Sequence, residues 1–255
     1  MNRFHFRQAF VFLLLFLFYI LHALKLSLLP WGTDYLGRDL GFQWIESSLT
    51  SISISILVAT GSLVFGLSLA IFIYESPGWL RRIFQYLTDI IVSFPHTLWM
   101  IFIALGIRSL GSILGETSRL RFLEMILTLT LGLWMGTCRL ILQWIELEKG
   151  KAFVQSAVAL GASSLRIYRH HILPQYREEL QQQWIQLFLS SMLYEGSLSF
   201  FGVGLMPPST SWGIMLQQNW RYFSIAPMSV LLPTLSMMVL VFLLHPSVQG
   251  SPRSS

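Results

Sequence analysis

The chain contains 255 residues, of which 54% are hydrophobic and only 11% are charged. Because a water-soluble domain carries about 25% charged residues, this composition excludes an ordinary soluble protein and indicates lipid as the main solvent. The single cysteine, Cys138, excludes an internal disulfide bond. The net charge of +5 suits nucleic-acid binding only if the basic residues are gathered in one place.

Six mostly apolar segments are each about as long as the 20 residues that a helix needs to cross a bilayer core. They lie at about 9–29, 49–74, 87–107, 122–142, 184–205 and 226–245. The sequence therefore predicts an all-α polytopic membrane protein with six transmembrane helices in a single domain. Arg3 and Arg7 before the first segment resemble the start of a signal peptide. No A-x-A cleavage site follows them, so we expect a retained first helix.

The second segment contains the stretch "SISISI" at 51–56, which alternates like a β-strand. The apolar run continues to Tyr74, and an open sheet edge cannot lie in lipid, so we predict a helix. Small residues then fall on one stripe of that helix: Ser51, Ser55, Ala59, Ser62, Gly66 and Ala70. Such a stripe lets helices pack closely in a membrane, and we favour packing over a pathway lining.

The basic residues indicate the orientation. With the N-terminus inside, 30–48, 108–121 and 206–225 lie outside, and 75–86, 143–183 and the tail lie inside. Of the 17 Lys and Arg residues, 11 are then inside or at inner helix ends and 6 are outside. This split agrees with the positive-inside rule and excludes the nucleic-acid interpretation.

The stretch "QSAVALGASSLRIYRHHILPQ" interrupts the apolar chain at 155–175, inside the predicted cytoplasmic loop. It predicts a helix-turn-helix between the fourth and fifth transmembrane helices. Gly161 ends the first helix, Ser163 or Ser164 caps the second, and Pro174 ends the second. The residues alone leave two partners open for this basic segment, namely anionic lipid headgroups and a partner protein.

Two of the acidic residues in or near apolar segments are candidates for a specific role. Glu195 shares a helix face with Ser191, Ser199 and Gly202, and a buried ionisable residue is either functional or bound to a neighbouring helix. Asp89 precedes a kinking proline, Pro95, by six residues. We expect Asp89 to act as an interfacial cap or to pair with Arg81 or Arg82.

No catalytic or metal-binding motif is found in the sequence. There is no G-x-x-x-x-G-K-[ST] loop and no H-E-x-x-H motif. His96, His170 and His171 are scattered without carboxylate or thiol partners, so we expect no metal site. A membrane-embedded enzyme and a membrane scaffold or assembly protein remain the alternatives from other classes. On the outer side, we expect "MPPSTSWG" to form a re-entrant elbow with Trp212 and Trp220 at the interface.

Several stretches resemble the permease subunits of ABC importers. The run "QSAVALG" with a downstream "ILP" is similar to their "EAA" loop, which has the form E-A-A-x3-G. The stretches "GTDYLGRD" at 32–39, "DIIVSFP" at 89–95, "EGSLSFFGVGLMPPSTSWGIML" at 195–216 and "APMSVLLP" at 226–233 resemble the subfamily that imports dipeptides, oligopeptides and nickel. The resemblance covers most of residues 30–235, and the run at 195–216 is its most specific part.

The resemblance implies a non-enzymatic transport subunit of the bacterial inner membrane, with both termini cytoplasmic. Its permease unit would span about 49–245 and its coupling loop about 143–183. It would form half of the pathway for peptides or a related small solute, such as a nickel complex, and work by alternating access. The implied partners are a second homologous permease subunit, two ATPase subunits that bind ATP and Mg, and an extracytoplasmic substrate-binding protein. No cofactor is expected in this chain.

The resemblance also implies roles for particular residues. The ATPase-coupling loop would contain Gln155, Ser156, Ala157, Gly161, Ala162, Leu173 and Pro174. The binding protein would be faced by Asp34, Arg38, Asp39, Pro207, Pro208 and Trp212. Residues of the pathway or of helix packing would be Asp89, Pro95, Glu195, Ser199 and Gly202. Because the family tends to carry an acid at the position of Glu195, we favour a structural hydrogen bond there.

The chain departs from the family pattern at two places. Gln155 and Ser156 replace the usual Glu and first Ala of the loop, so any ion pair made by that Glu is absent. The tail "HPSVQGSPRSS" replaces a "GDxLRDxLDP"-like segment. These departures indicate a divergent member.

Overall fold

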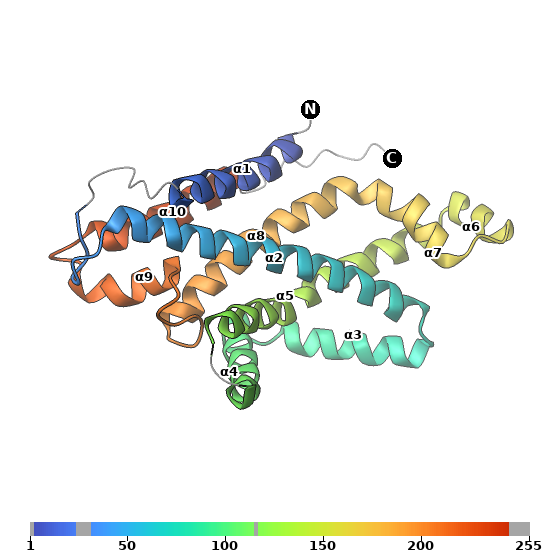
Figure 1. Ribbon diagram of the computed structural model, residues 1–255. Coiled ribbons are helices and arrows are strands. Elements are labelled where there is room, and N and C mark those ends of the chain that lie inside the picture. Colours follow the sequence, from blue (N-terminus) through green and yellow to red (C-terminus); the bar gives the residue numbers. More distant parts are fainter. Residues whose placement is uncertain (1–2, 24–31, 115–116, 245–255) are drawn as a thin grey trace.

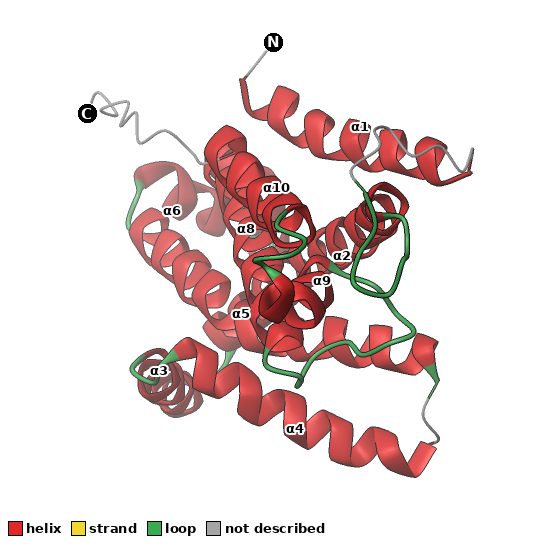
Figure 2. Cartoon of the chain, turned by 90° about the vertical axis from the view of Figure 1, so that its left-hand side faces the viewer, coloured by secondary structure: helices red, strands yellow, loops and turns green. Residues whose placement is uncertain are grey.

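The computed structural model describes residues 3–23, 32–114 and 117–244, and these are helical apart from their connecting turns (Figures 1 and 2). The longer helices are α1 (Arg3–Ala23), α2 (Leu40–Glu75), α3 (Gly78–Val92), α4 (His96–Leu114), α5 (Ser118–Lys149), α8 (Arg177–Phe200) and α10 (Met228–Leu244). The shorter ones are α6 (Ala152–Ala159), α7 (Ser164–Ile167), the π-helix η1 (Tyr168–Ile172), the 3₁₀ helices η2 (Leu173–Tyr176) and η3 (Trp220–Tyr222), and α9 (Trp212–Asn219).

Helix α2 is the centre of the arrangement and packs most extensively against α5 and α8. Helices α1 and α10 lie on one side of it, and α3 and α4 lie on the other (Figure 1). The short helices α6 and α7 project at one end of the molecule, while α9 lies at the opposite end. The long helices therefore hold the α6–α7 end and the α9 end at opposite ends of the molecule.

The small-residue stripe of α2 is buried along its whole length, which confirms the packing interpretation and the helix over "SISISI". At Gly66 this stripe comes very close to α5. A Cβ atom on Gly66 would lie 2.9 Å from both the Trp134 carbonyl oxygen and the Thr137 Cβ. Because real Cβ atoms do not come so close to a backbone oxygen, a glycine is needed at this position.

Within the described residues, α2 and the part of α5 from Arg119 to Lys149 are each long and apolar enough to cross a membrane, and α3 and α4 pass the same test only as a bent pair. Helices α1 and α10 contain shorter apolar stretches, at Ala9–Leu21 and Met228–Leu244. Helix α8 begins with several charged and amide side chains, which lower its mean hydropathy. The predicted segment 9–29 runs past α1 into residues 24–29, which lie outside the described residues, as does the predicted tail at 245–255.

The predicted third span at 87–107 is not one continuous helix. It is divided at 93–95 into α3 and α4, which are bent by 106°. Pro95 has no N–H to continue the hydrogen bonds of α3, and its carbonyl oxygen instead accepts the first N–H groups of α4, from Leu98 and Trp99. The proline therefore starts a new helix in a new direction.

The close contact at Gly66 predicts the direction in which an alanine substitution changes the stability of the protein. Gly→Ala inside a helix normally stabilises it by about 1 kcal/mol. We expect Gly66→Ala to destabilise the protein instead, by about 1–3 kcal/mol, because the new methyl group overpacks α2 against α5. The measurement is the melting temperature of the detergent-purified protein. Gly136→Ala on α5 is the control, since its Cβ would meet no atom within 4 Å, and an equal response of both variants would contradict this account.

Candidate functional site

The turn between α6 and α7 is held by backbone geometry. Gly161 has a φ of +79°, and this confirms the expected positive φ at the residue that ends α6. The Gly161 N–H donates to the Val158 carbonyl oxygen, and the Ala162 N–H donates to that of Ala157. Large apolar side chains next to the turn are exposed: Val158, Leu160 and Leu165. The turn thus presents exposed apolar side chains on the side that faces away from the long helices.

The opposite face of this insert is packed onto the long helices. Ala157 and Ala162 lie against a buried cluster that includes Ile167 and Ile172 together with Ile141 and Ile145 of α5. Gln155 and Ser156 are exposed, and their side chains bond only to nearby backbone carbonyl groups, at the end of α5 and within α6. The Gln155 Nε2 donates to the Gly150 carbonyl oxygen at 3.3 Å, and the Ser156 Oγ donates to that of Ala152 at 2.8 Å.

The second helix of the insert does not end at Pro174 as predicted. It continues from α7 through η1 and η2 directly into α8. Pro174 is accommodated because it occupies the first turn of η2, where its missing N–H is not required. Ser163 stands at the N-cap position of α7, but its side chain makes no capping hydrogen bond. Leu173 is half-buried beside the proline.

Glu195 is fully buried and bonds to serines of two helices. Its Oε2 accepts from the Ser51 Oγ of α2 at 2.9 Å, and its Oε1 accepts from the Ser199 Oγ of α8 at 2.9 Å. The Ser51 Oγ also accepts the backbone N–H of Trp212, at the start of α9. The expected hydrogen bond to a neighbouring helix is therefore present, and the carboxylate links α2, α8 and α9. Gly202, with a φ of +76°, follows the end of α8.

Trp212 does not lie at the interface, in contrast to the prediction. Its side chain is 1% exposed, and its Nε1 donates to the Ser48 Oγ of α2 at 3.0 Å. The residue after Trp212 lies directly against α8, since a Cβ on Gly213 would lie 2.5 Å from the Gly196 carbonyl oxygen. This backbone contact between α9 and α8 places the tryptophan in the interior of the protein. Trp220 does lie at the surface, with the Arg221 guanidinium over its ring.

At the end that carries α9, two stretches far apart in the sequence meet. The Arg38 Nε contacts the Asp34 Oδ2 at 2.7 Å, and its Nη2 donates to the Gln218 Oε1 of α9 at 3.0 Å. The rings of Tyr35 and Tyr222 are stacked at 4.3 Å. We call this assembly of residues 32–39 with α9 and η3 the outer cap, after the side of the membrane on which the sequence predicts it.

The acidic residues predicted to face a binding protein have local roles in this cap. Asp34 is buried and accepts the Leu36 and Arg38 N–H groups, so it shapes the turn rather than the surface. Asp39 caps α2 by accepting the Phe42 N–H at 2.8 Å. Arg38, Pro207 and Pro208 are exposed.

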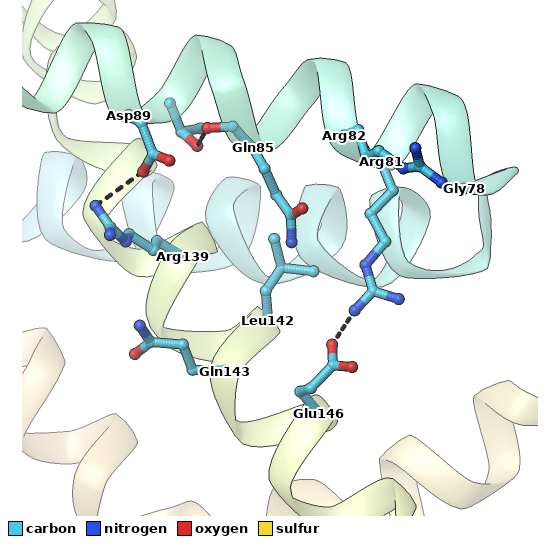
Figure 3. Close-up of a pocket in the computed structure, with 10 residues that line it drawn as sticks. Gly78, Arg81, Arg82, Gln85, Asp89, Arg139, Leu142, Gln143 and Glu146 are labelled. Carbon is cyan, nitrogen blue, oxygen red and sulfur yellow. Dashed lines mark hydrogen bonds and ion pairs between the residues drawn. The ribbon is translucent and has the colours of Figure 1, made fainter.

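A cavity of about 660 Å³ lies between α3 and α5 (Figure 3). Helix α3 lies toward the end of the molecule that carries α6 (Figure 1). The Arg139 Nη1 contacts the Asp89 Oδ1 at 3.1 Å, and Arg81 contacts Glu146. The expected pairing of Asp89 with Arg81 or Arg82 is therefore wrong. Arg81 lies eight residues before Asp89, about 12 Å along the helix, whereas α5 runs alongside α3.

The cavity therefore carries both signs of charge. Arg82 also lines it and has no ion pair within the described part of the chain. Arg139 and Glu146 were not singled out in the sequence, because only the packing of α5 on α3 gives them their partners. Among residues 3–23, 32–114 and 117–244, no three His, Cys, Asp or Glu side chains are grouped to hold a metal ion.

Comparison with known proteins decides the family. The family described as "Binding-protein-dependent transport system inner membrane component" matches residues 62–250. The chain belongs to this family. It is 28% identical over 210 residues to the dipeptide transport system permease protein DppC of Alkalihalophilus pseudofirmus, which is 82% of this chain and 66% of that protein.

Two further relatives come from Brucella. The chain is 30% identical over 195 residues to proteins of Brucella suis and Brucella abortus whose names describe peptide transport system permeases. These matches cover 75% of this chain and 60% of each relative. The chain thus spans about two thirds or less of the length of the curated relatives it matches. It is an inner-membrane component of a binding-protein-dependent transport system, of the ABC importer permease type.

The Glu195 network predicts different outcomes for two substitutions. Glu195→Gln keeps an oxygen for one serine and preserves the shape of the side chain, so we expect stability close to that of the wild type. Glu195→Leu leaves the hydroxyl groups of Ser51 and Ser199 without their acceptor in a buried site. We expect a loss of about 1–3 kcal/mol for each hydroxyl that finds no other partner. Thermal unfolding of the purified protein measures both, and equal stability of the two variants would contradict the structural role.

Proposed function

We propose that this chain is the transmembrane subunit of an ATP-driven importer of peptides and forms half of the translocation pathway. The observation that carries the proposal is the separation of the exposed α6–α7 turn and the outer cap at opposite ends of the long helices. One end can bind a cytoplasmic ATPase, and the other can receive solute from a binding protein. The names of the dipeptide and peptide permease relatives support peptides as the solute.

The α6–α7 turn is the proposed docking surface for the ATPase subunit. Its exposed residues Val158, Leu160 and Leu165 are apolar and surround Gly161. An apolar surface of this kind is stabilised by contact with a protein groove. Since Gln155 carries no charge, docking here depends on shape and apolar contact, and it varies little with salt concentration. A second permease subunit of the same family completes the pathway.

The cavity between α3 and α5 is the proposed cytoplasmic part of the pathway. A peptide carries a positive amino end and a negative carboxyl end. In the cavity, the carboxylates of Asp89 and Glu146 can attract the amino end of a peptide. The guanidinium groups of Arg81, Arg82 and Arg139 can attract its carboxyl end. Alternating access then moves solute from the outer cap to this cavity while partner subunits hydrolyse ATP.

The proposed orientation places the α6–α7 turn in the cytoplasm and the outer cap outside, with six membrane segments and both termini inside. Single cysteines at Ser209 and Ser224, next to the outer cap, should therefore react with an impermeant thiol reagent added to intact cells. A cysteine at Ser163 should react only after the cells are opened. Cys138 is fully buried, so the native background should be low. Labelling of position 163 in intact cells would overturn this orientation.

Gly161→Val tests the docking role of the turn. A β-branched residue at a φ of +79° is strained, so the turn should change shape while the long helices remain unaltered. We expect the complex to reach the membrane, and either to lose its ATPase subunits or to hydrolyse ATP without moving peptide.

The measurements are ATPase retention on purification and peptide uptake into proteoliposomes. Gly150→Val is the matched control, because Gly150 has a φ of −76° and open space around its Cβ position. Normal retention and uptake in the Gly161→Val complex would show that the turn does not dock an ATPase.

A further inference from the structure

The segment from Tyr168 to Tyr176 joins the α6–α7 insert to α8 and is not an ordinary helix. It consists of the π-helix η1 followed by the 3₁₀ helix η2. Short π and 3₁₀ stretches within a helix often mark hinges, because their hydrogen bonds have poorer geometry than those of an α-helix. A movement of the insert could therefore be absorbed in this segment before it reached the long helices, unless side chains hold the segment in place.

A tyrosine stands at each end of the segment, and each donates its hydroxyl group to a carboxylate on a different long helix. Tyr168 donates to Glu75, the last residue of α2. Tyr176 donates to the Glu148 Oε1, in the last turn of α5, at 2.8 Å. The two ends of the segment are thus bonded to the two helices that flank α8.

The Tyr168 ring is 5% exposed and meets the Tyr74 ring edge-on, with centroids 6.1 Å apart. Burial of the ring raises the pKa of the Tyr168 hydroxyl above its usual range, and the hydrogen bond to Glu75 raises it further. The phenol therefore keeps its proton at cytoplasmic pH and remains a donor. Glu75 itself is exposed, so the carboxylate can be changed without leaving a buried charge.

The second pair is more deeply buried. The Tyr176 ring is 3% exposed and stacks on Trp144 of α5 at 4.5 Å. Glu148 is 1% exposed, and its Oε1 also contacts the Lys151 Nζ at 2.6 Å. Lys151 is the N-cap residue of α6. One buried carboxylate therefore holds both the residue before α6 and the residue before α8, and a charge so placed needs these partners.

We propose that the Tyr168–Glu75 and Tyr176–Glu148 hydrogen bonds are the positioning contacts that carry movement of the α6–α7 insert into α2 and α5. This inference rests on the proposed function, in which the insert binds an ATPase. The bonds bypass the hinge-like segment, so a displaced insert shifts the inner ends of three long helices together. Without them, η1 and η2 deform and the movement is lost.

The test uses the full complex in proteoliposomes and compares Tyr168→Phe and Tyr176→Phe with the wild type. Each substitution removes only the hydroxyl group and keeps the buried ring. We expect ATP hydrolysis to stay within about twofold of the wild type, while peptide taken up per ATP falls by about tenfold, the scale set by a hydrogen bond to a charged group.

Three further variants sharpen the test. Tyr86→Phe on α3 is the matched control, because Tyr86 is 75% exposed and has no hydrogen-bond partner within the described residues, so its uptake per ATP should be unchanged. Glu75→Ala removes the acceptor itself at an exposed position and should reproduce the effect of Tyr168→Phe even if a buried change impairs assembly. The double variant Tyr176→Phe with Glu148→Gln should take up at least as much peptide per ATP as whichever of its two single variants takes up less.

The outcomes separate this inference from the proposed function. Wild-type uptake per ATP in both phenylalanine variants would overturn the inference. An equal fall in ATP hydrolysis and uptake would also overturn it, because that pattern indicates a structural role alone. A wild-type complex that binds no ATPase, or shows no ATP-dependent uptake, would instead contradict the proposed function.

Discussion

The fold depends on the close approach of α2 to α5 and α8. Serine, alanine and glycine along one face of α2 let the neighbouring backbones come near, and Gly66 admits the Trp134 carbonyl where any side chain would collide. Lipid supplies no hydrophobic force between helices, so such packing and the few buried hydrogen bonds determine the arrangement. Ser51 contributes to both, since it lies on the packing face and donates to Glu195.

Both ends of the molecule follow from this central packing. At one end, the same α2 and α5 supply Glu75 and Glu148, which hold the exposed insert. At the other, α2 supplies Ser48 and Ser51, which hold Trp212 and so position the outer cap. A helix that is packed along its middle can thus position polar groups at its two ends, as the proposed place between an ATPase and a binding protein requires.

Sequence patterns predicted the features that depend on local chemistry or periodicity. The small-residue stripe of α2, the positive φ of Gly161 and the bond of Glu195 to a neighbouring helix are of this kind. Other features depend on which helices become neighbours, and a single sequence does not contain that information directly. Asp89 pairs with Arg139 because α5 lies beside α3, Trp212 is buried by the contact of α9 with α8, and Pro174 continues into α8 through a 3₁₀ turn. The break at Pro95 also exceeded the expected kink.

The contact between Gly213 and Gly196 limits how α9 can move. A Cβ atom on Gly213 would lie 2.5 Å from the Gly196 carbonyl oxygen, so the two backbones touch directly. Helix α9 therefore cannot rotate against α8 without first separating from it. Any displacement of α9 carries the adjoining part of α8 with it as one unit.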